Sequence, residues 1–517
     1  MIRREFIAKA LGALTASIVA PLLRAQDMGH MGGMGGMSGM THSLAAVDAL
    51  PAGALLHELP RLGNESGTRG VFRAELTARP TQVELIPGIK STRWLYNGTP
   101  NGPLIDVREG DTVEIRFVNH LPQPSTIHWH GLPVPAAQDG NARDRVEPGR
   151  SRVYRFTLPP GSAGTYWYHP HPHRLSAEQV FRGLAGPIIV RAANDPLAEL
   201  PERHLFVTDL KLAADGSVAP NDMMDWMNGR EGQFALVNGQ RRPRIAAAGS
   251  ERWRIWNASN ARYLRLTLGG YEFAQVGTDG GLLAAPRPGL TELLLAPAER
   301  AEIVVPARSA GSALLAADVY DRHKMSMPHG SLPASALLPL ADVEFVPGAA
   351  RALPTSLRAL SSLGESKAVK RIAFAERMDM AAMLKPGAAA NERPRGMKFL
   401  INGKTFDLGR VDLVSRRGEI ELWEIDNQSD MDHPFHLHGT QFQVVEREHN
   451  GVSVTEPYLA WRDTVNVRPG GKVRFKTVQQ SEGIRMFHCH ILEHEDLGMM
   501  GQLQVITGDN LHSATAG

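Results

Sequence analysis

The sequence predicts an all-β protein, and two observations carry this prediction. The first is a series of short stretches in which apolar and polar residues alternate, such as 111–117 (DTVEIRF), 251–257 (ERWRIWN) and 419–425 (EIELWEI). Many short strands separated by Gly, Pro and Asn are typical of β-sandwiches and β-barrels. Helical periodicity is scarce, and the Ala/Leu-rich stretch 352–363 is one candidate helix. The second observation is an internal repeat.

The repeat consists of an Asn-Gly pair, a second turn that begins with Gly, and a further Asn. Three copies of this repeat begin 141 and 164 residues apart, a spacing that suits one β domain for each copy. Each copy predicts a turn, a strand, a tight turn and a strand. We therefore expect β domains over 68–196, 197–347 and 348–510. The three copies are Asn97-Gly98, Gly110-Asp111 and Asn119; Asn238-Gly239, Gly249-Ser250 and Asn257; and Asn402-Gly403, Gly418-Glu419 and Asn427.

Composition and charge exclude several classes of protein. The chain has 517 residues, of which 43% are hydrophobic and 21% charged, as in a packed globular protein and unlike a disordered one. Lys and Arg number 56 against 54 Asp and Glu, so no basic excess is available to neutralise nucleic-acid phosphates. The single cysteine, Cys489, excludes a disulfide within the chain.

The first 25 residues are interpreted as a twin-arginine signal peptide. Arg3 and Arg4 precede an apolar stretch over 10–23, whose 14 residues are fewer than the ~20 that span a bilayer as a helix. We expect cleavage near Ala25 and export to the periplasm, or otherwise out of the cytoplasm. The twin-arginine route exports proteins that are already folded, which would suit a protein loaded with a cofactor before export. An uncleaved membrane anchor is the alternative. No other segment is long and apolar enough to cross a membrane, so no stable membrane insertion is expected after cleavage.

Residues 26–67 are expected to form a flexible Met- and Gly-rich tail followed by a linker. Glycine at the density of 27–42 (DMGHMGGMGGMSGMTH) cannot hold a fold. A plain linker has no need for exposed methionines, which are oxidisable, whereas thioether and imidazole are soft ligands that suit Cu(I). We therefore favour Cu(I) capture over a plain linker. The candidate ligands are Met28, His30, Met31, Met34, Met37, Met40 and His42.

Histidine is the unusual residue of this chain, and ten of its twenty histidines fall into four clusters. On a strand, residues i and i+2 point to the same face, so the two imidazoles of a His-x-His pair reach toward one point, as a metal site requires. A single pair is more often a surface or core pair, but four clusters in matching places of two repeated domains favour metal binding. The middle repeat ends in NASNARYLRL, without histidine, and is expected to be a spacer. The clustered residues are His128, His130, His169, His171, His433, His436, His438, His488, His490 and His494.

Cys489 lies between two of these histidines, His488 and His490. In an extended segment the cysteine faces one way and both histidines face the other. Zinc is a competing metal, but catalytic zinc usually takes three protein ligands at one ion and would leave eight histidines unexplained. A blue-copper electron-transfer centre has two histidines, one cysteine and a weak axial methionine. The matching residues are His433, Cys489, His494 and Met499.

The position of Cys489 suggests a mechanism. An electron at the cysteine has one residue of backbone to cross, in either direction, before it reaches a histidine of the opposite face. A copper group on that face would store electrons. The use for such a store is the reduction of O₂ to water, which takes four electrons.

The four clusters resemble those of the three-domain multicopper oxidases, a family that includes laccases, ascorbate oxidase and bacterial copper-resistance oxidases. The resemblance covers residues 70–508 of this chain. It implies three cupredoxin-like Greek-key β-barrel domains, with a trinuclear copper cluster between the first and the third. One cluster departs from the frequent His-Ser-His of the family, because it is His169-Pro170-His171. Proline keeps the backbone extended, so we expect these ligands to survive.

The resemblance implies four copper ions, whose ligands are carried over position by position. Type 1 copper would take His433, Cys489, His494 and Met499. Type 2 copper would take His128 and His436. The type 3 pair would take His130, His169, His171, His438, His488 and His490. Some family members have lost their copper ligands, but all ten histidines and the cysteine are present here, so that alternative is set aside.

Two acids adjoin the clusters. Asp139 follows the first cluster, and Glu495 directly follows His494. Reduction of O₂ consumes protons, and carboxylates near the coppers could relay them. Both acids match residues that look like proton donors in the bacterial family members. We favour this proton relay over the alternative, in which each acid is a solvated loop residue.

The sequence predicts the reaction, reduction of O₂, but leaves more than one candidate for the electron donor. Cu(I), oxidised to Cu(II) for copper tolerance, is favoured because of the tail and of methionines upstream of the last clusters, although methionine also fills gaps in ordinary cores. Phenols and aromatic amines, the substrates of a laccase, are the alternative. A copper storage protein or chaperone would have no use for the connection through Cys489. Nitrite reduction, a further alternative, needs type 1 and type 2 copper but not a cluster of eight histidines. The upstream methionines are Met325, Met327, Met378, Met380 and Met383.

Overall fold

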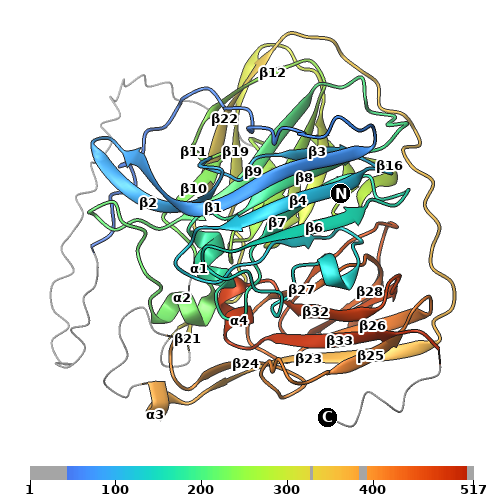
Figure 1. Ribbon diagram of the computed structural model, residues 1–517. Helices are drawn as coiled ribbons and strands as arrows, with labels where there is room; N and C mark the ends of the chain where they lie inside the picture. Colours follow the sequence, from blue (N-terminus) through green and yellow to red (C-terminus); the bar gives the residue numbers. More distant parts are fainter. Residues whose placement is uncertain (1–42, 327–329, 333, 384–392, 509–517) are drawn as a thin grey trace, which may run out of the picture. The chain divides into compact units, whose positions relative to one another are not determined.

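The computed structural model describes residues 43–326, 330–332, 334–383 and 393–508, and Figure 1 shows its ribbon. The predicted signal peptide and the Met-rich tail up to His42 lie outside the described residues. Strands dominate the described part of the chain and the helices are short, which confirms the predicted all-β class. None of the helices in this part is long and apolar enough to cross a membrane.

The strands of the first third form two four-stranded sheets with a common core. The sheet orders are β2-β1-β4-β6 and β3-β8-β7-β5. Their core includes Ile115, Trp129 and Tyr166, all fully buried. The strands are β1 (Val71–Ile86), β2 (Ile89–Tyr96), β3 (Ile105–Arg108), β4 (Thr112–Asn119), β5 (His128–His130), β6 (Ser151–Thr157), β7 (Gly164–His169) and β8 (Gly186–Arg191).

The middle third forms a seven-stranded and a five-stranded sheet. The orders are β11-β10-β9-β13-β18-β15-β16 and β12-β22-β19-β14-β17. Their core includes Trp253, Leu266 and Val343. The strands are β9 (Glu202–Leu210), β10 (Phe234–Val237), β11 (Gln240–Arg241), β12 (Arg244–Ala248), β13 (Glu251–Asn257), β14 (Leu264–Leu268), β15 (Phe273–Thr278), β16 (Gly281–Leu290), β17 (Glu292–Leu295), β18 (Arg300–Val305), β19 (Gly311–Asp318) and β22 (Leu338–Val346).

The last third forms a six-stranded and a five-stranded sheet, in the orders β24-β23-β26-β31-β28-β29 and β25-β33-β32-β27-β30. The aromatic side chains of Trp423, Phe435 and Phe475 lie in their core. The strands are β23 (Ala368–Met378), β24 (Met397–Ile401), β25 (Leu413–Arg416), β26 (Ile420–Asn427), β27 (His433–Leu437), β28 (Phe442–His449), β29 (Val452–Thr455), β30 (Thr464–Val467), β31 (Gly471–Val478), β32 (Gly483–Cys489) and β33 (Met500–Ile506).

The three copies of the sequence repeat occupy equivalent places in these three pairs of sheets. The first Asn of each copy has a φ between 50° and 52°, a left-handed conformation that Asn tolerates better than most residues. Its side-chain oxygen accepts a hydrogen bond from the first strand of its third, at 2.7–2.9 Å, and its side-chain nitrogen donates to a carbonyl two residues earlier on that strand. The donating N–H groups belong to Thr77, Phe206 and Ala373.

The last Asn of each copy is also equivalent in all three thirds. It ends a strand that runs parallel to the first strand of its third. Its side-chain amide donates to two backbone carbonyls, one four or five residues further on and one on a later segment, at 2.8–3.0 Å. The sequence repeat is therefore a structural repeat. Its last residues are Asn119, Asn257 and Asn427.

The described part of the predicted linker, from residue 43 on, packs against the middle third and, from residue 60 on, against the first third. Single β-bridges join Leu44 to Ala213 and Leu55 to Arg244. Leu50 and Leu59 are 3% and 5% exposed. This segment thus shields apolar side chains near β9 and β10 from water.

The prediction of a candidate helix over 352–363 is wrong, because the structure has no helix there. Pro354 disfavours a helical conformation in the residue before it. The N–H of Leu357 instead donates to the carbonyl of Ala284 at 2.8 Å. The Leu357 side chain packs into a small core with Val276. Tertiary contacts therefore take the place of helical hydrogen bonds in this segment.

Three short helices meet beside the histidine clusters: α1 (Ser176–Phe181), α2 (Met223–Asn228) and α4 (Leu492–Asp496) (Figure 1). Helix α2 begins at a capping box, in which the Asp222 carboxylate accepts from the Asp225 N–H and the Asp225 carboxylate from the Asp222 N–H. The remaining short elements are η1 (Ala136–Gln138), β20 (Met325–Ser326), β21 (Gly330–Ser331) and α3 (Met380–Met383).

Candidate metal centre

Strand register brings the histidine clusters together in pairs. In the first third, His128 of β5 lies opposite His169 of β7. In the last third, His436 of β27 lies opposite His488 of β32, and Phe435 lies opposite Cys489. Alternation along β32 therefore places Cys489 on one face of the sheet and His488 on the other.

All ten clustered histidines are fully buried, as are Cys489 and Met499. Burial disfavours the charged imidazolium, and it lowers the pKa of His433 and His488 to about 3. Burial also lowers the pKa of His130 and His169 well below the ordinary value of 6.5. A neutral imidazole has a free lone pair, which is the form that binds metal ions.

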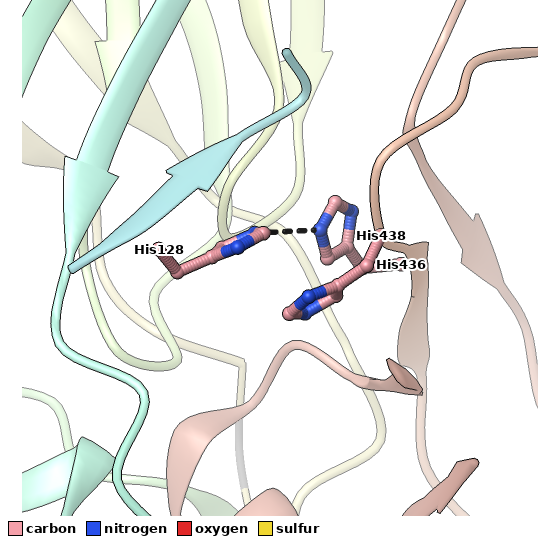
Figure 2. Close-up of side chains that lie close together, drawn as sticks. All are labelled: His128, His436 and His438. Carbon is pink, nitrogen blue, oxygen red and sulfur yellow. Dashed lines mark hydrogen bonds between the residues drawn. The ribbon is translucent and has the colours of Figure 1, made fainter. Parts of the chain in front are cut away.

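The first group of facing nitrogens joins the first third to the last. Figure 2 shows His128 facing His436 and His438, and the Nε2 atoms of His128 and His436 are 3.4 Å apart. The other nitrogen of each ring is already engaged. His128 Nδ1 lies 3.0 Å from the carbonyl oxygen of Asp139, and His436 Nδ1 lies 2.8 Å from that of Asp463. With the proton on Nδ1, each ring directs its Nε2 lone pair at the other.

A second group is formed by the Nε2 atoms of His171, His438 and His488. His488 Nε2 lies 3.2 Å from His171 Nε2 and 3.1 Å from His438 Nε2. The Nδ1 atoms of His438 and His488 are held by the Asp139 carboxylate and the Cys489 carbonyl, at 3.0 and 2.9 Å. Three lone pairs therefore converge on one point.

The third group contains His130, His169 and His490, whose ring centroids are 5.0–5.7 Å apart. His130 Nδ1, His169 Nε2 and both ring nitrogens of His490 have no hydrogen-bond partner among the described residues. A buried nitrogen without a partner is costly, and a metal ion would satisfy it.

Cys489 is the centre of a fourth group on the opposite face. Its Sγ lies 3.3 Å from His433 Nδ1 and 4.0 Å from His494 Nδ1, and these two nitrogens are 3.3 Å apart. The second nitrogen of His494 lies 3.2 Å from the carbonyl of Met227 in α2. Met499 is tied to the group through its backbone, because its carbonyl accepts from the Cys489 N–H at 3.0 Å.

These donor sets fit copper. Soft thiolate with two imidazoles and a nearby thioether suits a blue-copper centre, and clusters made only of imidazole suit copper as well as zinc. The structure brings together in these four groups eleven of the twelve side chains that the resemblance assigned to the four coppers, namely those of His128, His130, His169, His171, His433, His436, His438, His488, Cys489, His490 and His494. The twelfth residue, Met499, is buried and contacts Cys489 through its backbone.

The two predicted relay acids lie at the histidines and are buried. The Asp139 carboxylate contacts His438 Nδ1 at 3.0 Å and His128 Nδ1 at 3.3 Å. Glu495 accepts a hydrogen bond from the Ser176 hydroxyl of α1 at 2.7 Å and lies 3.5 Å from His171 Nε2. Burial, together with the nearby Asp496, raises the pKa of Glu495 well above its usual range. Neither acid is a solvated loop residue.

The sequence analysis missed Asp463, which contacts two of the histidines. Its carboxylate lies 2.9 Å from His130 Nε2, and its carbonyl accepts from His436 Nδ1. Asp463 precedes β30, in no cluster of metal-binding residue types, so no sequence signal distinguished it.

Only some of the methionines expected near the site fall within the described part of the chain. Met325 and Met378 are partly buried against the core that holds Cys489, and Met383 is buried in it. The Met327 and Met380 side chains lie outside the described part.

Comparison with known proteins identifies relatives over nearly the whole chain. Two family profiles described as multicopper oxidase match residues 77–195 and 377–509. The multicopper oxidase mco of Staphylococcus haemolyticus is 32% identical over 86% of this chain and 90% of its own. The laccase of Bacillus subtilis is 27% identical, over 83% of this chain and 94% of its own. Among solved structures, a multicopper oxidase from Campylobacter jejuni, titled a metallo-oxidase, is 43% identical with a TM-score of 0.85, over 91% of this chain and 98% of that one.

Proposed function

The chain belongs to the multicopper oxidase family and has its cupredoxin-like fold, and on that premise we propose that it oxidises Cu(I) and passes the electrons to O₂, which is reduced to water. Membership of this family means that the protein is a copper-dependent oxidoreductase that uses O₂ and a reductant. Our proposal adds the reductant, the four-electron product and the residues that hold the copper.

The proposed ligands follow the four groups of facing atoms. His433, Cys489, His494 and Met499 would hold type 1 copper; His128 and His436 type 2 copper; and His130, His169, His171, His438, His488 and His490 the type 3 pair. Copper bound there would supply one-electron transfer at the cysteine and the electrons for O₂ reduction at the histidine cluster.

The chain's own residues connect and insulate these groups. Cys489 is bonded through one backbone unit to His488 and through another to His490, so the electron path from donor side to oxygen side is covalent. The complete burial of the ligands excludes bulk water from this path. The carbonyls of Asp139 and Asp463 fix the tautomers of His128 and His436, and so keep their Nε2 atoms available.

Two carboxylates are placed to handle the protons that O₂ reduction consumes. Glu495 is linked through the Ser176 hydroxyl to helix α1, and its carboxylate lies close to His171 and His488. Asp139 bridges His128 and His438 from the opposite side. We propose that Glu495 and Asp139 hold and release protons at these carboxylate oxygens.

Methionines near the proposed type 1 copper ligands support Cu(I) as the reductant. Helix α2 supplies the Met227 carbonyl to His494, and it begins with Met223 and Met224, which are partly buried against the same core. Met325 and Met378 lie partly buried against that core as well. Thioethers are soft ligands that bind Cu(I). The Campylobacter jejuni relative, titled a metallo-oxidase, agrees with a metal ion as donor.

The predicted export signal supports the proposed role in copper tolerance. The twin arginines Arg3 and Arg4 precede an apolar stretch that is too short to span a bilayer. We propose that the chain is exported by the twin-arginine route and acts in the periplasm, where the Met/His tail over 27–42 would collect Cu(I) for the oxidase.

The test measures O₂ consumption by the copper-loaded protein, with Cu(I) and separately with 2,6-dimethoxyphenol. Each donor is offered to the mature chain and to a chain that lacks residues 27–42. Fast turnover of Cu(I), slowed by loss of the tail, is the expected result. Fast phenol turnover that ignores the tail would identify a laccase, and copper uptake without O₂ consumption would identify a storage protein.

A further inference from the structure

The middle third contributes no histidine to the four groups of proposed copper ligands, but one of its arginines, Arg300, reaches them. Arg300 begins β18, and its two terminal nitrogens meet the Asp463 carboxylate in a bidentate pair at 2.8 and 2.5 Å. Both side chains are fully buried. A bidentate guanidinium–carboxylate pair has a defined geometry as well as a strong interaction.

Asp463, held in place by Arg300, contacts two histidines of different domains. His130 Nε2 lies 2.9 Å from its Oδ1, and His436 Nδ1 donates to its carbonyl at 2.8 Å. A carboxylate acceptor requires the proton of His130 on Nε2, which leaves the unpartnered Nδ1 as the only lone pair for a metal. His436 is turned the opposite way, with Nε2 free.

Arg300 is itself held by several contacts. Its Nε donates to the Thr165 carbonyl of β7 at 2.9 Å, and Nη1 donates to the carbonyl of Ala298 at 2.9 Å. The backbone N–H of Arg300 donates to the Asp279 carboxylate at 2.7 Å. The guanidinium therefore contacts all three thirds of the chain, and it balances the charge of a carboxylate that would be costly to bury alone.

Gly131 leaves the space that this arrangement needs. It follows His130 directly and has a φ of +83°. A Cβ at this position would lie 2.1 Å from Asp463 Oδ2 and 2.7 Å from Arg300 Nη2. Only glycine lets the ion pair approach the His130 backbone so closely.

We propose that Arg300 is a positioning residue for the trinuclear copper cluster, which it organises from the middle domain through Asp463. The pair selects the nitrogen of His130 that faces the metal and holds His130 and His436, from the first and last domains, in one orientation. The middle domain is then more than a spacer. The inference rests on the proposed function, because it assumes that these histidines bind copper.

The experiment compares copper loading in the full-length wild-type protein and in Arg300→Gln. Loss of a residue that orients metal ligands typically weakens metal affinity about 10- to 100-fold. We expect the type 2 and type 3 coppers of Arg300→Gln to be removed by a 10- to 100-fold lower chelator concentration, with an altered type 2 electron paramagnetic resonance spectrum. Type 1 copper should keep its blue absorption, which reports on the folding of the last domain in the same sample.

Two further variants separate positioning from a general loss of stability. Arg252→Gln removes another buried arginine of the middle third, which pairs with Glu302 at 2.5–2.8 Å and with Asp195 at 2.6 Å. It should leave the type 2 spectrum unchanged. Arg300→Lys keeps the charge but not the bidentate geometry, and should lie between wild type and Arg300→Gln.

The outcomes are distinct. Unchanged chelator sensitivity and type 2 spectrum in Arg300→Gln would overturn the inference, and so would an equal change in Arg252→Gln or parallel loss of type 1 copper. A wild-type protein that binds no copper at the histidine cluster would instead overturn the proposed function.

Discussion

At the scale of single residues, the contact made by one ring nitrogen decides where the other one points in His128, His436 and His438. The Asp139 carbonyl and carboxylate hold His128 and His438, and the Asp463 carbonyl holds His436. A carboxylate beside two histidines has to be placed accurately. Gly140, next to Asp139, has a φ of +71°, and a Cβ there would lie 1.8 Å from the carbonyl oxygen of Ile127. The turn that positions Asp139 therefore requires glycine at this position.

The axial position gives a prediction for Met499. Replacing the thioether by the non-coordinating side chain in Met499→Leu should raise the reduction potential of type 1 copper, because a weak axial ligand stabilises the oxidised ion. Redox titration of the blue absorption measures this shift. Met500→Leu changes the neighbouring buried methionine, which lies in a different apolar cluster, and serves as the control. An unchanged or lower potential in Met499→Leu would contradict the assignment.

The proton relay gives a second prediction. Glu495→Gln keeps the size of the side chain but cannot release a proton, so reoxidation of the reduced protein by O₂ should slow about 100-fold. Reduction of type 1 copper by the donor should keep its rate. Stopped-flow absorption at type 1 copper separates the two steps. Glu178→Gln, on the adjacent helix α1, is the control. Equal slowing of both steps would assign Glu495 a structural role instead.

At the scale of elements, strand register does most of the assembly. The pairing of β5 with β7 sets His128 beside His169, and the pairing of β27 with β32 sets His436 beside His488. A slip by one residue would turn each histidine to the opposite face. The elements without regular structure matter too, since the segment from residue 43 covers apolar side chains of the middle third.

This covering segment gives a prediction for stability. Leu50 is 3% exposed and packs in a cluster with Leu210 and Phe234, whereas Leu55 is 60% exposed. Leu50→Ala should lower the free energy of unfolding by about 2–5 kcal/mol through lost burial and a residual cavity. Leu55→Ala should change it by less than about 0.5 kcal/mol. Denaturant unfolding followed by tryptophan fluorescence measures both. Equal effects would mean that the segment contributes no packing.

At the scale of the whole molecule, buried ion pairs connect the thirds of the chain. Arg254 of β13 donates to Glu302 and to the Thr165 hydroxyl of β7, at 2.6 and 2.7 Å. Arg300 joins the middle third to Asp463. Removing one partner of a buried pair leaves an uncompensated charge, so such contacts fix the relative placement of the domains more than they add stability.

One partly buried carboxylate, that of Glu231, predicts how stability depends on pH. Burial opposes ionisation of Glu231, but Arg322 and Arg262 outweigh it and lower its pKa from 4.5 to about 2. The folded state therefore favours the ionised carboxylate. The resulting stability is fully present above pH 4.5 and is lost as the pH falls toward 2. Wild type should exceed Glu231→Gln in stability by on the order of 3 kcal/mol at pH 7, and the difference should shrink below pH 4.5.

Thermal unfolding at pH 7, 4.5 and 3 tests this dependence. Glu58→Gln, which changes an exposed carboxylate, should track wild type at every pH. A stability difference for Glu231→Gln that stays constant across this range would contradict the assigned pKa.

How much of the structure the sequence predicts depends on how far apart in the chain the interacting residues lie. The all-β class and the structural repeat could be predicted because alternation and Asn-Gly turns are local patterns. The conformation of 352–363 could not be predicted, since its backbone bonds to Ala284, far away in the sequence, instead of forming the helix that its composition suggested. Asp463 was missed for the same reason, because its histidine partner His130 lies 333 residues away.

The sequence by itself determined which residue types are available and which neighbours share a face, because spacing along a strand is set by covalent geometry. It placed Cys489 one residue from His488 and from His490. Only the tertiary structure decided which clusters face each other. His128 meets His436 across 308 residues, and Arg300 meets Asp463 across 163. Those encounters depend on how whole sheets pack, and no local pattern in the chain encodes that packing.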